Sequence, residues 1–220
     1  DNGTLYYPIT AKNSKDTFVD SNWNSVFQTG DFWQNDLSMS GGNENNTYYF
    51  SLGNVKQKGI IRESTYDRTS LRFNFNSKIN DWITLSNKMY YAYTDSNRIQ
   101  QSSNTAGVML GLLRTPPDFD QRDYKGTYYT SSGVEYTKRH RSYRKYLGNS
   151  QNPSYNNPLW TINEQVAGTK VNRITATPQL TFEPTNWLNV IARGNIDVSN
   201  DKRTYFFPIG SGGARNVGMY

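Results

Sequence analysis

Three aspartates lie close together in the stretch PPDFDQRD, at positions 118, 120 and 123. Ca²⁺ binds closely spaced carboxylate oxygens, so Asp118, Asp120 and Asp123 are candidates for a calcium site. The stretch lacks the glycine and the distal bidentate glutamate of a recognised calcium-binding loop. The default expectation is therefore that the chain binds no metal and needs no cofactor.

A second chemically suggestive stretch is the basic run KRHRSYRK, Lys138–Lys145, which contains the only histidine, His140. With Tyr136, Tyr143 and Tyr146 interleaved, such a run could meet nucleic acid, lipopolysaccharide phosphates or a partner protein. A solvated loop is the simpler interpretation, and nucleic acid is not an expected partner.

Catalytic chemistry is poorly represented in the chain. His140 has no Ser or Cys nucleophile near it in sequence, and no Gly-rich loop opens a helix after a strand. Paired carboxylates for glycoside hydrolysis converge only in space and leave no mark in a sequence. We expect the chain not to be an enzyme.

The most extensive set of polar side chains lies on alternating strands. In TSLRFNFNSKI, residues 69–79, Leu71, Phe73 and Phe75 share one face and Arg72 and Asn74 the other. Polar strand faces could line a substrate route, because sugars are held by hydrogen bonds and by stacking on aromatic rings; the plainer interpretation is a solvated inner wall. The candidate lining residues are Tyr49, Arg68, Arg72, Asn74, Asn76, Lys88, Tyr90 and Arg193.

The strands that must position these residues are predicted in hairpins. Pro178 interrupts one of them and must lie where no ladder donor is required. A short helix is predicted over 105–114, before Pro116 and Pro117. The predicted strands span about 34–40, 47–57, 69–79, 82–94, 173–182 and 187–197, with a further one possible over 203–209.

Connections between the predicted strands differ sharply in length. Short polar turns lie at one end of the hairpins, whereas the connection over about 95–170 is long. A soluble sandwich has shorter strands and distributes its loops over both ends. Long strands with short turns on one side and long loops on the other are typical of an outer-membrane barrel.

Composition agrees with β structure. Apolar residues make up 35% of the 220 residues, aromatic residues 15%, and the mean hydropathy is −0.83; this favours polar and aromatic strands over helix bundles. There is no cysteine, which excludes disulfides and thiolate metal sites. No apolar run approaches a membrane helix, and because the chain starts at Asp1 we expect it to be processed or part of a longer protein.

Several spaced motifs resemble one known family. They are SGGN at 40–43, SLG at 51–53, QKGII at 57–61, YDR at 66–68, NDW at 80–82, NPLWTIN at 157–163 and KVNRI at 170–174. In this order they resemble the barrel of SusC/RagA-family TonB-dependent outer-membrane transporters, from about Asn22 onward.

The resemblance implies an all-β fold, an antiparallel transmembrane barrel portion that is part of a 22-stranded barrel with long extracellular loops. It also implies TonB-dependent import of oligosaccharides or peptides across the outer membrane of a Gram-negative bacterium. The implied partners are a SusD-like surface lipoprotein acting as a lid, the TonB/ExbB/ExbD complex, and outer-membrane lipid with lipopolysaccharide. Plug, TonB box and terminal strand are not found in these residues.

If the family resemblance holds, residues 1–31 lead into the barrel and residues 32–220 form part of its wall, with the external loop at about 95–170. Trp82 and Trp187 each follow a short turn and are candidates for an interfacial aromatic girdle. Both align with polar positions, so either a bulge turns them outward or they lie inside the rim.

A secreted carbohydrate-binding β-sandwich is the alternative function class. It requires Phe73, Phe75, Leu85 and Tyr91 to pack against a second sheet, and it predicts a soluble, cooperatively unfolding monomer.

Overall fold

A computed structural model describes residues 17–99, 103–129, 132–143, 155–208, 211 and 218–219. Within these residues most of the chain forms one antiparallel sheet of eight strands in the order β1-β2-β3-β4-β7-β9-β10, with β8 also paired to β7. None of the described helices has the length and apolar character needed to cross a bilayer.

Strands β1 to β4 are neighbours in both sequence and space, whereas β7 lies beside β4 and pairs with both β8 and β9. Their bounds are β1 Asp31–Gly42, β2 Asn46–Lys58, β3 Thr65–Asn80, β4 Ile83–Asn97, β7 Val166–Thr185, β8 Leu188–Arg193, β9 Ile196–Phe207 and β10 Gly218–Met219. The six predicted strands are therefore present, and most extend beyond the predicted limits. The predicted fold class, mostly antiparallel sheet with few helices, is confirmed.

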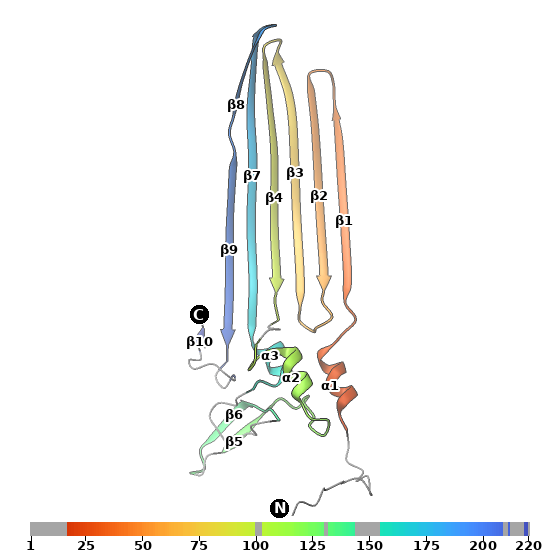
Figure 1. Cartoon of the computed structure of the whole chain (residues 1–220), viewed down its shortest axis with the longest axis vertical. Coiled ribbons are helices and arrows are strands. Elements are labelled where there is room, and N and C mark those ends of the chain that lie inside the picture. The colour runs from red at the N-terminus through yellow and green to blue at the C-terminus, as the bar shows by residue number, and fades with distance from the viewer. Residues whose placement is uncertain are drawn as a thin grey trace, which may run out of the picture.

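The remaining elements form what we call the cap, at one end of the sheet (Figure 1). It contains three short helices and a separate two-stranded sheet. These elements are α1 Val19–Val26, α2 Val108–Arg114, α3 Pro158–Glu164, β5 Lys125–Tyr129 and β6 Glu135–His140. Helix α2 confirms the helix predicted before Pro116, whereas α1, α3 and the β5–β6 hairpin lack a strong periodic signal in the sequence.

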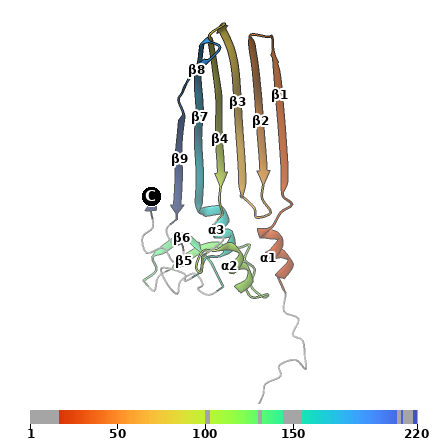
Figure 2. The ribbon, with the colours of Figure 1, turned by 45° about the horizontal axis from the view of Figure 1, so that its top comes forward.

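Short turns and long connections lie at opposite ends of the sheet (Figure 1). The β1–β2, β3–β4 and β7–β8 turns lie at the end that we call the turn end, and the long connection between β4 and β7 builds most of the cap. A view turned by 45° keeps the sheet and the cap separate (Figure 2). The predicted asymmetry of loop lengths is thus a property of the fold.

Pro178 explains why one predicted strand is divided into β8 and β9. Ala176 lies opposite Ile196 and Gln179 lies opposite Arg193, so the register continues across the break. The N–H of Gly194 donates to the carbonyl of Pro178 at 3.0 Å. Proline has no N–H to return the bond, and the ladder is interrupted at this point.

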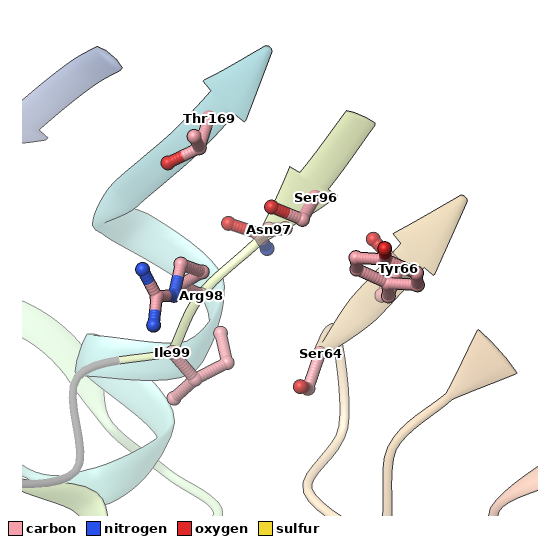
Figure 3. Close-up of a pocket in the computed structure, with 8 residues that line it drawn as sticks. Ser64, Tyr66, Ser96, Asn97, Arg98, Ile99 and Thr169 are labelled. Carbon is pink, nitrogen blue, oxygen red and sulfur yellow. The ribbon is translucent and has the colours of Figure 1, made fainter. Parts of the chain in front are cut away.

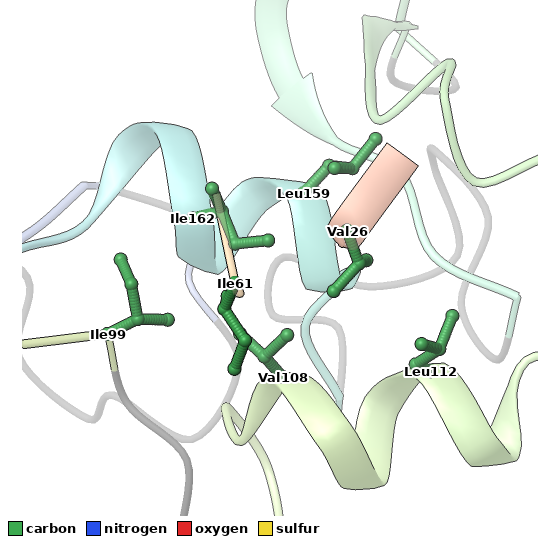
Figure 4. Packing of buried hydrophobic residues seen from close by; sticks show 7 residues of the cluster. All are labelled: Val26, Ile61, Ile99, Val108, Leu112, Leu159 and Ile162. Carbon is green, nitrogen blue, oxygen red and sulfur yellow. The ribbon is translucent and has the colours of Figure 1, made fainter. Parts of the chain in front are cut away.

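Buried apolar side chains lie in the cap rather than on the sheet (Figure 4). Val26 of α1, Val108 of α2 and Ile162 of α3 are almost fully buried against one another. Ile61, from the β2–β3 connection, and Ile99, just after β4, belong to the same cluster. Because the segments that supply them are far apart in sequence, this core ties the long connection to α1. It also holds the cap against the ends of β2 and β4.

Candidate ligand-facing wall

The register divides the sheet into two faces. In an antiparallel ladder, residues directly opposite one another project to the same side. Phe50 lies opposite Phe73, which lies opposite Met89, and this row belongs to what we call the apolar face. Tyr49, Asn74 and Lys88 form the adjacent row, on what we call the polar face. The alternation predicted from the sequence therefore runs continuously across neighbouring strands.

The apolar face is uncovered. Leu71, Phe73 and Val190 are 37%, 41% and 49% exposed. No second sheet packs on them among the described residues, where the only other sheet is β5–β6 in the cap. The packing that a β-sandwich requires is therefore not found in this part of the chain.

The apolar positions form a band of limited height. From Leu71 to Ile79 the band covers eight residue steps of β3, about 27 Å at ~3.4 Å per residue. A strand tilt of ~40° reduces this to about 21 Å, close to the ~25 Å apolar band of membrane barrels. Toward the cap the band ends at a row that includes Asn54 and Thr69, followed by a charged row that includes Lys56 and Asp67.

All eight predicted lining residues lie on the polar face. Asn76 and Arg193 belong to one cross-strand row, each opposite a residue of β4 or β7. The next row toward the cap contains Tyr49, Asn74 and Lys88, and the row after it contains Arg72 and Tyr90. Arg68 lies two rows closer to the cap. The structure thus brings them onto one surface, while their role in binding a ligand stays a prediction.

Tyr90 is the centre of a small basic cluster on this face. The guanidinium of Arg68 donates a hydrogen bond to the hydroxyl of Tyr90. The guanidinium of Arg72 lies over the ring of Tyr90, 5.7 Å from its centroid. The pattern of alternation placed these residues on one face, but only the pairing of β3 with β4 brings both guanidinium groups to the same tyrosine.

Other charges on the polar face have partners. Arg173 forms a bidentate pair with Asp197, with N–O distances of 3.0 and 2.6 Å. Arg193 donates from Nε to the side-chain oxygen of Gln179 at 2.8 Å. These contacts hold β7 to its neighbours on the β8–β9 side.

Two shallow hollows lie over the candidate residues. One has a volume of about 340 Å³ and is lined by Arg72, Asn74, Lys88 and Tyr90, with Thr175 and Thr177 from β7. The other, of about 480 Å³, lies toward the turn end between Tyr49, Asn76 and Gln179. Thr175 and Thr177 were not among the predicted lining residues, although their alternation with Ala176 could have indicated them.

A third hollow, of about 530 Å³, lies where the sheet meets the cap (Figure 3). Its walls are rich in hydroxyl groups, with Ser96 and Thr169 on adjacent strands and Tyr66 on β3. Arg98 and Ile99 extend from the end of β4 beside it. Sequence patterns did not predict this hollow, because it depends on the packing of the cap.

Trp82 and Trp187 occupy equivalent places at the turn end. Each is the last residue of its two-residue turn, and they are 55% and 82% exposed. A register shift lies before each turn, between Lys78 and Asn80 and between Phe182 and Thr185. The N–H of Glu183 donates to the carbonyl of Trp82 at 2.7 Å, which joins the two turn regions. Membership of an aromatic girdle stays a prediction.

The predicted calcium ligands do not converge. Both carboxylate oxygens of Asp120 accept hydrogen bonds from Arg122, at 2.9 and 2.8 Å. The Arg122 guanidinium lowers the pKa of the Asp120 carboxyl below its ordinary value. Asp123 forms an ion pair with a different arginine, with its Oδ2 3.6 Å from Nη1 of Arg141. Over the described residues no group of three or more His, Cys, Asp or Glu side chains is placed to hold a metal ion.

The basic run is partly built into the cap, contrary to the expectation of a solvated loop. His140 is 4% exposed, and its Nε2 accepts a hydrogen bond from the N–H of Asn157 at 2.6 Å. Burial lowers the pKa of His140 from 6.5 to about 3, so the imidazole is neutral. The Arg141 guanidinium lies over the ring of Phe119, 4.5 Å from its centroid. Arg144, Lys145 and Tyr146 fall outside the described residues.

Asn157, whose N–H binds His140, also anchors an amide network within the cap. The side chain of Asn157 donates to the carbonyls of Gln121 and Arg141 at 2.9 and 3.1 Å. Its Oδ1 accepts from the N–H of Leu159 at 2.9 Å and so caps α3. Gln121 in turn donates to the carbonyl of Asn22 in α1 at 2.6 Å. The motif NPLWTIN was used in the sequence analysis only as evidence of a family resemblance. Its first residue, Asn157, joins α3 to the segments that contain Gln121 and Arg141.

A long antiparallel sheet with one exposed apolar face and one polar face is the arrangement that a portion of a β-barrel wall would have. No family model matches the chain. Among curated proteins it is similar to the TonB-dependent receptors P39 and P26 of Formosa agariphila, 27% identical over 104 residues and 25% identical over 114 residues. These alignments cover 47% and 51% of this chain but only 10% and 11% of the receptors.

Solved structures of the RagAB transporter show the same fold. The "closed-closed" state of the RagAB peptide importer matches with a TM-score of 0.60 and 22% identity, over 84% of this chain and 19% of that one. The "open-open" state matches with a TM-score of 0.61 and 21% identity, over 87% and 20%. The chain is thus similar in sequence to parts of TonB-dependent receptors, and the RagAB structures show that it shares their barrel fold over about a fifth of the solved chains. The relatives are named as receptors and transporters, which agrees with the expectation of a non-enzyme.

Proposed function

We propose that this chain is part of the barrel wall and external loops of a TonB-dependent importer in the outer membrane of a Gram-negative bacterium. The observation that carries the proposal is the sheet with an uncovered apolar band on one face and polar side chains on the other. In this proposal the apolar face contacts lipid, and the polar face lines the water-filled lumen of the barrel. Only a closed ring satisfies every backbone donor in hydrocarbon.

The sheet also has two edge strands that could pair with further strands. Within the described residues β1 pairs only with β2, and β9 pairs on its outer side only with two residues of β10. A long unpaired edge carries a row of free N–H and C=O groups. Completion of a 22-stranded ring by other parts of the protein removes both edges. Residues 32–220 supply part of that ring, and residues 1–31 lead into it.

The orientation follows from the two ends of the sheet. Outer-membrane barrels have short periplasmic turns and long external loops. The turn end then faces the periplasm, with Trp82 and Trp187 at that interface, and the cap, built mostly by about 95–170, faces the outside. The apolar band between them meets outer-membrane lipid and, on the outer leaflet, lipopolysaccharide.

The cargo in this proposal is an oligosaccharide or a peptide, captured between the lid and the polar face of the wall. RagAB, the structural neighbour, is a peptide importer. By analogy a SusD-like surface lipoprotein covers the external end as a lid, and TonB, ExbB and ExbD supply energy through parts of the protein beyond this chain. The cap, in which Gln121 links Asn22 of α1 to Asn157 at the start of α3, offers the lid a surface.

Membrane extraction and uptake test the proposal together. The full-length protein should remain in the outer-membrane fraction until detergent is added, and uptake of its cargo should stop when TonB is deleted. A full-length protein that is freely soluble without detergent, or uptake that is indifferent to TonB, contradicts the proposal. Expression of residues 17–208 alone should give aggregates, whereas a β-sandwich would give a soluble monomer.

A further inference from the structure

The polar face carries an uncompensated positive charge at its centre. Arg68, Arg72 and Lys88 lie on the adjacent strands β3 and β4, within two to three rows of one another. None of the polar-face positions of β2, β3 and β4 is acidic. The acidic residues that this face does carry are Asp36 on β1, Glu183 near the end of β7, and Asp197 and Asp201 on β9. Glu183 lies at the turn end, where its Oε1 accepts a hydrogen bond from Asn189 at 2.8 Å.

Those acidic residues are already engaged. Asp197 is paired with Arg173, and Asp201 is paired with Arg203. Asp36 accepts a hydrogen bond from Gln34 at 2.6 Å. Lys78, the remaining cation of β3 on this face, is paired with Asp81 at the turn end, 3.0 Å away. The three central cations therefore have no acidic partner among the described residues.

The geometry around Tyr90 leaves basic donors available to a ligand. Arg68 uses one N–H on the Tyr90 hydroxyl, and Arg72 rests on the ring of the same residue. A guanidinium has five N–H donors, so both arginines keep donors directed to solvent. The 340 Å³ hollow places Arg72 and Lys88 beside the neutral groups of Asn74, Thr175 and Thr177.

We infer that this wall binds an acidic oligosaccharide, one that carries carboxylate or sulfate groups. Charge-assisted hydrogen bonds from Arg and Lys recognise the oxyanions, and the amide and hydroxyl groups recognise the sugar hydroxyls. The polar-face neighbours of this hollow offer few apolar side chains, which disfavours a peptide that must bury its own side chains. The inference rests on the proposed function and adds the charge of the cargo and the residues that select it.

Binding to the full-length transporter, purified in detergent with any lid protein that copurifies, tests this inference by calorimetry. The probes are an oligogalacturonate, a sulfated chondroitin oligosaccharide, a neutral malto-oligosaccharide of equal length and an oligoglutamate peptide. We expect at least one acidic saccharide to bind, with an affinity that weakens as salt is added. The double variant Arg72→Gln with Lys88→Gln should weaken that binding about tenfold or more, the scale of a charge-assisted hydrogen bond.

Lys78→Gln is the matched control, since it removes a cation of the same face that is paired and lies near the turn end. It should leave binding within about twofold, the scale of a screened surface charge. Equal binding of the neutral saccharide, no binding of either acidic saccharide, preferential binding of the peptide, or equal losses in the double variant and the control each overturn the inference. Because binding in detergent needs no TonB, such a failure is separate from loss of TonB-dependent uptake, which would overturn the proposed function.

Discussion

The N–H of Gly194 donates to the carbonyl of Pro178 at 3.0 Å, and proline cannot return the bond. Residues on both sides keep one register, with Ala176 opposite Ile196 and Gln179 opposite Arg193. A single missing donor therefore divides an otherwise continuous strand.

Pro178→Ala should restore the ladder at this position. The new N–H points toward β8 and β9, because in an antiparallel strand a residue's N–H and C=O face the same neighbour. The gained bond contributes about 1 kcal/mol, partly offset by the freer unfolded chain. Slower hydrogen exchange across residues 188–198 of the full-length protein would show it. Thr175→Ala, on the same strand, should leave that exchange unchanged; equal effects of the two changes would contradict the explanation.

Adjacent residues of β3 should differ in their tolerance of charge. Phe73→Lys places an ammonium on the apolar band and should destabilise the folded protein in lipid by about 2–4 kcal/mol. Asn74→Lys places the same group on the polar face and should cost less than about 1 kcal/mol. Urea unfolding of the full-length protein in lipid vesicles measures both. Similar losses for the two variants would mean that the faces do not meet lipid and water as proposed.

Acid should loosen the cap through His140. Its pKa is about 3 when folded and 6.5 when exposed. The unfolded cap therefore binds the proton first, so stability is complete above pH 6.5 and is lost as the pH falls from 6.5 toward 3. At pH 5 the loss is about 2 kcal/mol.

Hydrogen exchange of α3, corrected for the intrinsic effect of pH, measures this loss between pH 7 and pH 5. In His140→Gln the same comparison should show little change, since the group that titrates in this window is gone. Asp120, whose pKa lies below its ordinary value of 3.8, contributes only at lower pH. If the same pH dependence persists in His140→Gln, another titrating group is responsible for the loss of stability.

Asn157→Ala should open the cap more than a change at the exposed Asn24. It removes the side-chain cap of α3 and two hydrogen bonds from the Asn157 amide, to the carbonyls of Gln121 and Arg141. The combined cost is about 3 kcal/mol. Asn24→Ala, on the exposed side of α1, is the control and should cost less than about 0.5 kcal/mol. Limited proteolysis of the full-length protein within residues 103–164 compares the two, and equal cleavage rates would exclude Asn157 as the joining residue.

Local patterns in the sequence determined the strands and their two faces. The alternation of Leu71, Phe73 and Phe75 with Arg72 and Asn74 is a period of two, which any extended backbone converts into opposite faces. Asn80 and Asp81 favour a turn at this point, although the turn residues in the structure are Asp81 and Trp82. Pro178 removes a donor wherever the strand is placed. These features need no knowledge of the partner strand, so they could be predicted from the residues alone.

Tertiary structure decided which side chains meet. Arg68 and Tyr90 lie 22 residues apart, and only the register of β3 on β4 brings them into contact. His140 is buried because α3 packs against it, with the ring of Trp160 5.1 Å from the imidazole and the N–H of Asn157 bonded to its Nε2, although its basic neighbours in sequence predicted a solvated loop. Contacts of this kind depend on long-range packing of the chain, and a local pattern of hydrophobicity and charge does not contain that information.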